Sequence, residues 1–238
     1  MENITVLIGI QARTNSTRLP NKAMKKIMGI PTVDHVVNAA LKSSQYMNRF
    51  SERTGIRSLV WALIPEGDPL KEYLEGRPGL YVHSGDPDDL VERYSFLVEE
   101  FNPDYIVRLT ADCPLLPPFL ITKCINTAVK NKYDFLDTAH PEYRCFFDGA
   151  DVEVMSSKAF EWVYKNATDR EHVCNILRSD PPEWMNMGAI FSYLDLSAFK
   201  LSIDTQKDFD LVKNQIVSVQ NKKRKWEEKH GKSSAHSF

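Results

Sequence analysis

Residues 4–22 read ITVLIGIQARTNSTRLPNK, and this stretch determines which class of fold the chain can form. The first six residues are apolar apart from one threonine, a pattern typical of a buried β-strand. The loop that follows is built of small residues and carries three permanent cations, Arg13, Arg18 and Lys22. In an open α/β sheet, ligands bind beyond the carboxyl ends of the strands. The loop is therefore predicted to bind a strongly anionic ligand such as a triphosphate, because guanidinium and ammonium groups match phosphate oxygens.

The alternative is that the three cations form a solvated surface. The chain contains no Gly-x-x-x-x-Gly-Lys-Ser/Thr loop and no Gly-x-Gly-x-x-Gly loop, so neither standard phosphate cradle supports the first interpretation. The remaining sequence has to decide between the two.

The amino-acid composition of the chain excludes some classes of function. The chain has 238 residues, of which 42% are hydrophobic and 26% charged, and a formal net charge of −2. A general nucleic-acid binder is usually basic, so an anion site here must be a local concentration of Arg and Lys. The four cysteines include no Cys-x-x-Cys pair, and the first apolar run is too short to span a bilayer. We therefore expect a cytoplasmic protein with free thiols that binds neither nucleic acid nor membrane.

Strand-like and helix-like segments alternate along the chain. This order predicts an α/β fold of Rossmann-like type, with a mostly parallel central sheet and helices on both faces. Right-handed crossovers would bring the loops 13–22, 84–89 and 110–112 together at one edge. Residues 1–220 are predicted to form one domain, and residues 221–238 a charged, disordered tail. We expect strands near 4–9, 59–64, 80–83, 105–109, 134–137, 151–155 and 201–204, and helices near 32–43, 69–74, 88–101, 119–131, 157–164 and 206–219.

Two aspartates follow predicted core strands. Asp112 comes directly after the strand at 105–109, and Asp204 ends the strand at 201–204. Two carboxylates at strand ends can hold one Mg²⁺, with phosphate oxygens and water completing the octahedron. The alternative for Asp204 is the N-cap of the following helix.

Several motifs in a fixed order resemble one enzyme family. The order is Gln-Ala-Arg-x-x-Ser-Thr-Arg-Leu-Pro-x-Lys, Gly-x-Pro, Asp-x-Pro-Leu and Asp-Thr-x-x-Asp-Phe. It resembles the cytidylyltransferases that make CMP-activated sugars, in particular their spore coat polysaccharide branch, with the CMP-KDO and CMP-acylneuraminate synthetases as cousins. Segments typical of that branch are 84–94, 108–115, 148–154 and 170–173, and the resemblance spans about residues 4–215. Asn21 stands where the sugar synthetases usually carry Gly, and residues 134–198 match them poorly, so the acceptor does not follow from the resemblance.

The resemblance implies a Rossmann-like nucleotidyltransferase fold that transfers CMP from CTP to an acceptor and releases pyrophosphate. Mg²⁺ would be required, and the acceptor would be a sugar or a phosphorylated or phosphonate compound, used for surface polysaccharide biosynthesis. It also implies a homodimer, joined through an acceptor and dimerisation region at 134–198.

The residues fall into three predicted groups. The catalytic group is Arg13, Lys22, Asp112 and Asp204, with the two aspartates as metal ligands. The nucleotide-binding group is Gln11, Ala12, Arg13, Arg18, Lys22, Ser84, Gly85, Thr110, Ala111 and Asp112. The acceptor-binding group is Arg108, Asp148, Asp151, Glu153, Arg170 and His172.

Other interpretations remain open at this point. A glycosyltransferase that uses a nucleotide-sugar usually holds its metal with Asp-x-Asp, whereas Ala111-Asp112-Cys113 offers one acid. A non-catalytic nucleotide-binding protein would be favoured by loss of Lys22 or either aspartate, and all three are present. The segment 170–172 could equally be a surface cluster of ion pairs, and Cys113 is more often a packing residue than a nucleophile.

Overall fold

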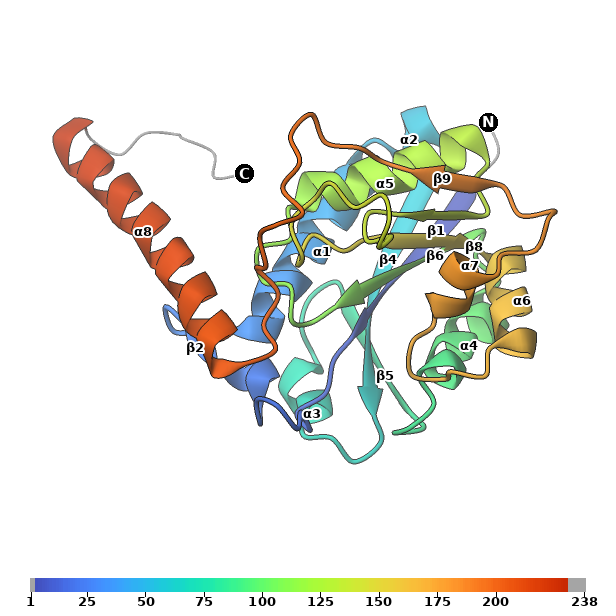
Figure 1. Cartoon of the computed structure of the whole chain (residues 1–238), viewed down its shortest axis with the longest axis horizontal. Coiled ribbons are helices and arrows are strands. Elements are labelled where there is room, and N and C mark those ends of the chain that lie inside the picture. The colour runs from blue at the N-terminus through green and yellow to red at the C-terminus, as the bar shows by residue number, and fades with distance from the viewer. Residues whose placement is uncertain (1–2, 231–238) are drawn as a thin grey trace.

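The computed structural model describes residues 3–230, which form a seven-stranded sheet with helices on both faces (Figure 1). The strand order is β5-β4-β1-β6-β8-β7-β9. The four strands from β5 to β6 are mutually parallel, and β8 runs antiparallel to both of its neighbours. The strands of this sheet are β1 (Ile4–Gln11), β4 (Ile56–Pro65), β5 (Leu80–Gly85), β6 (Tyr105–Thr110), β7 (Phe135–Asp137), β8 (Glu153–Ser156) and β9 (Met187–Ala189).

The first strand shows how the two layers of helices arise. Successive side chains of a strand point to opposite faces. Val6 and Ile8 pack in the cluster that includes α1 (Thr32–Arg49) and α5 (Pro118–Asn131), whereas Leu7 packs with α4 (Leu90–Phe101) and α6 (Ser157–Asn166). All three are fully buried, as expected for a parallel strand covered on both sides. The predicted fold class is confirmed.

The remaining elements are short or peripheral. They are a small hairpin of β2 (Lys26–Ile27) and β3 (Ile30–Pro31), the 3₁₀ turn η1 (Lys22–Met24), and the helices α2 (Ser51–Thr54), α3 (Leu70–Leu74), α7 (Asn175–Ser179) and α8 (Gln206–His230). None of the helices in residues 3–230 has the length and apolar character that crossing a membrane requires.

The strand predicted at 201–204 is absent. The preceding residue, Lys200, forms an isolated bridge with Asp148, which lies outside the strands of the sheet, and Ile203 donates its backbone N–H to the carbonyl of Asp112 at 2.8 Å. The edge of β6 that a further strand would need is already paired with β8. Ile203 is nevertheless fully buried, so its apolar character reflects packing and not a strand.

The prediction of a disordered tail from residue 221 does not hold for residues 221–230. Helix α8 continues to His230 and extends away from the sheet and its covering helices (Figure 1). Two ion pairs, each between side chains one helical turn apart, favour this exposed stretch of helix: Lys223–Glu227 at 3.9 Å and Arg224–Glu228 at 3.8 Å. Residues 231–238 lie outside the described residues.

Candidate functional site

A hollow of about 490 Å³, here called the main pocket, lies at the carboxyl ends of β1 and β6. Gln11 and Thr110, the last residues of these strands, are neighbours in the sheet. The pocket therefore lies where a parallel α/β sheet is expected to bind its ligand. The predicted site residues that line it are Gln11, Ala12, Arg13, Arg18, Lys22, Arg108, Thr110, Ala111, Asp112, Asp148, Asp151, Glu153, His172 and Asp204.

Lys22 joins the basic loop to both predicted metal ligands. Its Nζ lies 2.7 Å from Oδ2 of Asp112 and 3.4 Å from Oδ1 of Asp204, and it also donates to the carbonyl of Ile203 at 3.0 Å. The two carboxylates come from segments more than 90 residues apart in sequence and meet at one ammonium group. Lys22 is therefore a partly buried residue of the pocket, whereas the side chains of Arg13 and Arg18 are exposed.

The carboxylate of Asp204 faces the pocket and does not cap α8. It accepts hydrogen bonds from Arg18 and Lys200, both at 2.8 Å. The helix start is capped instead by Thr205 and Asp208, which bond to each other's backbone N–H groups at 3.3 and 2.8 Å. Burial would raise the pKa of Asp204, but the hydrogen bond from Lys200 and the nearby charges of Lys22 and Arg18 lower it below the usual value. The carboxylate of Asp204 is thus ionised and surrounded by the cationic side chains of Lys22, Arg18 and Lys200.

A chain of buried ion pairs forms the other wall of the main pocket. Glu153 accepts hydrogen bonds from Arg108 and from Arg178, and Arg178 also donates to Asp137 at 2.7 Å. Burial would raise the pKa of Glu153, but the two guanidinium groups lower it to about 2. Arg108 further donates to the side chain of Gln11 at 2.7 Å. This wall therefore contains paired charges, and it links two residues predicted to bind the acceptor, Arg108 and Glu153, to Gln11, which is predicted to bind the nucleotide.

Asp151 is a largely buried acid of this pocket. Its Oδ1 lies 3.1 Å from Nη1 of Arg144, which also lies 3.8 Å from Asp148. Burial raises the pKa of Asp151 to about 6, against the attraction of Arg144. Its protonation state therefore changes close to physiological pH.

Three predicted site residues, Ser84, Gly85 and Arg170, do not line the main pocket. Arg170 donates to Asp89 at 2.7 Å, and its carbonyl accepts the N–H of Leu90 at 2.9 Å, so it attaches its loop to the start of α4. The predicted convergence of loops thus holds for 13–22 and 110–112, but 84–85 lie behind the pocket wall. His172 does line the pocket, and its Nδ1 contacts Asp169 at 3.0 Å.

Three arginines line the main pocket without having been predicted: Arg93, Arg144 and Arg178. Arg93 lies in the segment 84–94 that resembles the spore coat branch, three residues after Leu90, which also lines the pocket. Residues three apart on a helix lie on the same face, so the sequence could have indicated that Arg93 and Leu90 face the same side. Arg178 lies in a segment with no resemblance, and nothing in the sequence marked it.

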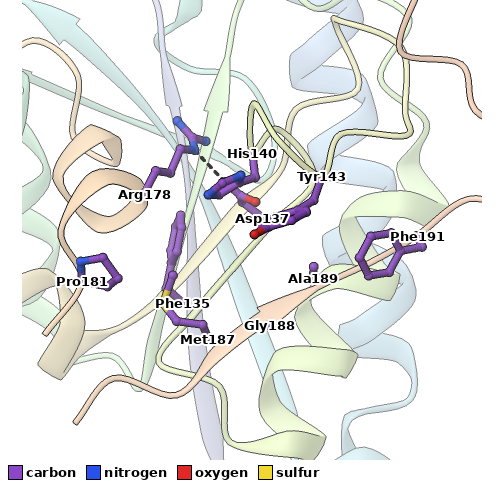
Figure 2. Close-up of a pocket in the computed structure, with 10 residues that line it drawn as sticks. All are labelled: Phe135, Asp137, His140, Tyr143, Arg178, Pro181, Met187, Gly188, Ala189 and Phe191. Atoms are coloured by element: carbon purple, nitrogen blue, oxygen red, sulfur yellow. Dashed lines mark hydrogen bonds and ion pairs between the residues drawn. The ribbon is translucent and has the colours of Figure 1, made fainter. Parts of the chain in front are cut away.

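A smaller hollow of about 400 Å³, the side pocket, adjoins this wall. Figure 2 shows Phe135 and Met187 on one side of it and Tyr143 and Phe191 on the other, with Arg178 bonded to Asp137 at its rim. Arg178 lines both hollows. An apolar compartment therefore lies next to the charged wall.

Comparisons with known proteins agree with this arrangement. The family model described as cytidylyltransferase matches residues 7–48, which contain residues 7–11 of β1 and the whole basic loop. An uncharacterized protein of Methanocaldococcus jannaschii, MJ1063, is 30% identical over 228 residues, covering 90% of this chain and 88% of the relative. The chain belongs to the cytidylyltransferase family. A second relative, the spore coat polysaccharide biosynthesis protein SpsF of Bacillus subtilis, is 24% identical over 220 residues, covering 87% of this chain and 85% of that protein.

Solved structures of cytidylyltransferases and related proteins share the fold. A cytidylyltransferase from Leptospira borgpetersenii superposes with a TM-score of 0.77 at 23% identity, covering 99% of this chain and all of that one. A CMP:2-keto-3-deoxy-manno-octonic acid synthetase complexed with CTP gives 0.64 at 13% identity, covering 90% and 99%. Rv0371c of Mycobacterium tuberculosis, complexed with manganese, gives 0.59 at 12% identity, covering 89% and 98%. The predicted family and enzyme class are confirmed.

Proposed function

We propose that this cytidylyltransferase transfers CMP from CTP to an acceptor oxygen and releases pyrophosphate. The observation that carries the proposal is the meeting of Lys22 with Asp112 and Asp204 at the carboxyl ends of the strands. This arrangement provides a cation for the phosphates beside two carboxylates for a metal. Such a transfer demands little covalent chemistry of the protein, which has to position groups and neutralise charge.

The basic loop would hold the β- and γ-phosphates. Arg13 pairs with Glu171 at 2.6 Å and Arg18 pairs with Asp204 at 2.8 Å, and both guanidinium groups are well exposed. Exposed pairs of this kind contribute only about 0–1 kcal/mol each, so a triphosphate can replace them at small cost. The loop can therefore close on the leaving group and stabilise its charge in the transition state.

The two aspartates fit a divalent metal ion, for which we propose Mg²⁺. Carboxylate oxygens are the protein ligands that Mg²⁺ takes, and it commonly binds one or two of them together with phosphate oxygens and water. Among residues 3–230, no three or more His, Cys, Asp or Glu side chains are grouped to hold a metal by themselves. Bound there, the ion would act as a Lewis acid and template at the α-phosphate. Lys22, which now contacts both carboxylates, would then turn its ammonium toward the phosphates.

The acceptor would bind against the wall formed by Arg108 and Glu153, with Asp148, Asp151 and His172 beside it. This wall contains paired acids and bases, which can bind hydroxyl groups as well as an anion. We propose a sugar or a phosphorylated or phosphonate compound as acceptor. The name of the relative SpsF supports a role in surface polysaccharide biosynthesis.

We further propose a homodimer joined through the region 134–198. Large apolar side chains of this region are exposed in the single chain, as expected of a surface that a second copy covers. They are Tyr143, Trp184, Phe191, Tyr193 and Leu194. Sedimentation of the purified chain tests this proposal, and a monomer at micromolar concentration would contradict it.

The activity is tested by measuring pyrophosphate release from CTP and Mg²⁺ with a panel of acceptors. Omission of the acceptor gives the background of CTP hydrolysis. Calorimetric titration should rank CTP above UTP, ATP and GTP. Equal or tighter binding of ATP would exclude a cytidylyltransferase.

A further inference from the structure

The basic loop has a narrow neck, at which its two ends are joined. The backbone N–H of Asn21 donates to the carbonyl of Thr14 at 3.0 Å. Asn21 adopts a left-handed backbone conformation, with φ at 57°, and the chain turns back at this point. Arg13 directly precedes the neck and Lys22 directly follows it. The position of Thr14 therefore helps to set the distance between two of the cations that are proposed to bind phosphates.

Asp68, a residue 54 positions farther along the chain, holds Thr14 in place. Oδ2 of Asp68 accepts the backbone N–H of Thr14 at 2.7 Å and the hydroxyl of Thr14 at 3.0 Å. The two bonds fix the backbone and the side chain of Thr14 together. Hydrogen bonds to a carboxylate are stronger than those to a neutral acceptor. The neck of the basic loop is thus attached to the turn that follows β4.

The turn after β4 holds Asp68 from its other side. Oδ1 of Asp68 accepts the N–H of Leu70 at 2.9 Å, at the start of α3. The backbone N–H of Asp68 donates to the carbonyl of Pro65, the last residue of β4, at 3.1 Å. Leu70 is itself 1% exposed. Asp68 is therefore fixed to both the sheet and α3, and it can serve as an anchor for the loop.

Asp68 lies outside the main pocket. Neither Asp68 nor Thr14 lines this hollow, whereas Arg13 and Lys22 both line it. The middle of the loop has a different anchor, because Leu19 is 5% exposed and packs among apolar side chains that include those of α8. Apolar packing thus holds the middle of the loop, and Asp68 holds its neck.

We propose that Asp68 is a positioning residue, which holds the neck of the basic loop in the form that binds the phosphates of the nucleotide; this proposal rests on the proposed function. A loop that is fixed before its ligand arrives avoids part of the ordering cost of binding. Arg13 and Lys22 then meet the triphosphate with their spacing already set, and they can stabilise the departing pyrophosphate without rearrangement. Asp68 acts on these cations through Thr14 and takes no part in the chemistry.

The test is calorimetric binding of inorganic tripolyphosphate and of CTP, each with Mg²⁺, to the full-length protein, with pyrophosphate release measured in parallel. In Asp68→Ser, the shorter side chain can still accept the N–H two residues on but does not reach Thr14. Thr14→Val removes the hydroxyl at nearly constant shape, and Thr14→Ser keeps it. Asp34→Asn is the matched control, because Asp34 is another partly buried carboxylate, which bonds to Tyr73 and Arg77 outside the main pocket. Thermal melting measures the stability of each variant.

Asp68→Ser should weaken the binding of tripolyphosphate and of CTP together, by about 10- to 100-fold, which is the loss known for groups that hold metal ligands in place. Thr14→Val should lose less, and Thr14→Ser should restore most of the affinity. A variant with both Asp68→Ser and Thr14→Val should lose no more than Asp68→Ser alone, because the hydroxyl has by then lost its partner. Asp34→Asn should lower the melting temperature and leave both affinities unchanged.

A wild-type affinity for tripolyphosphate in Asp68→Ser overturns the proposal. An equal loss in Asp34→Asn also overturns it, because the effect would then be one of general stability. If Asp68→Ser does not fold, Thr14→Val decides, and an affinity equal to that of Thr14→Ser overturns the proposal.

The same measurements separate this proposal from the proposed function. A wild-type protein that binds tripolyphosphate but neither prefers CTP nor releases pyrophosphate contradicts the proposed function, and the tripolyphosphate comparison still decides on Asp68. A wild-type protein that binds neither ligand overturns both.

Discussion

Replacement of Asp204 by Asn separates a role at the metal from a role at the helix start. The side chain keeps its size and one acceptor oxygen but loses the charge that faces Lys22, Arg18 and Lys200. These three pairs are partly exposed, so the loss in unfolding free energy should be about 1 kcal/mol. Loss of a residue that merely supports a metal ligand already costs about 10- to 100-fold in activity or metal affinity, so loss of a ligand should cost about 100-fold or more in kcat/KM.

Asp208→Ala is the comparison variant, because Asp208 caps α8 through Thr205 and contacts the site through the backbone N–H of Asp204, at 3.1 Å, and through Lys200, at 3.6 Å. Loss of such a cap costs about 1 kcal/mol in stability. Because the carboxylate of Asp204 itself is kept, activity should fall much less than in Asp204→Asn. The assay is pyrophosphate release across a Mg²⁺ titration, with thermal melting of each variant. The reasoning is refuted if folded Asp204→Asn turns over at a normal rate with an unchanged Mg²⁺ dependence, since Asp112 would then be the remaining protein ligand.

Three further predictions follow from the same geometry. Lys22→Ala should lower kcat/KM about 10- to 100-fold, because a hydrogen bond to a charged group contributes about 1.5–3 kcal/mol. Steady-state kinetics measure this effect, and unchanged kinetics would mean that the basic loop is only a solvated surface. Glu153→Gln should destabilise the fold by about 3–5 kcal/mol, because it leaves Arg108 and Arg178 buried without their shared carboxylate; urea unfolding measures it, and a loss below that of the exposed Glu161→Gln control would contradict it. The pKa of Asp151, raised to about 6 by burial, means that the folded state binds more protons than the unfolded state between about pH 4 and 6. Stability should therefore fall by up to about 3 kcal/mol as pH rises through that window, and Asp151→Asn should flatten the profile of melting temperature against pH; a profile that keeps its slope in the variant assigns the effect to other groups.

The sequence alone determined the class of fold and identified residues that the structure gathers in the main pocket. The apolar run of β1 and the short loop with three cations could be recognised from local chemistry, because a strand buried on both faces is apolar throughout and ligands of such a sheet bind directly beyond it. Asp112 could be predicted for the same reason, since it follows a buried strand on the same edge of the sheet. These features depend on neighbours in sequence, so they could be recognised without a structure.

The tertiary structure decided what depends on distant partners. Residues 201–204 have the pattern of a strand, yet they remain outside the sheet because β8 occupies the edge of β6. Asp204 could be either a cap or a site residue until Thr205 and Asp208 were seen to cap α8 themselves. Arg93 has the sequence of an ordinary helix-surface charge, and its burial against Gly85 depends on how α4 packs on β5. A residue's burial and its charged partners are set by contacts between elements far apart in the chain, and those contacts leave no periodic trace in the sequence.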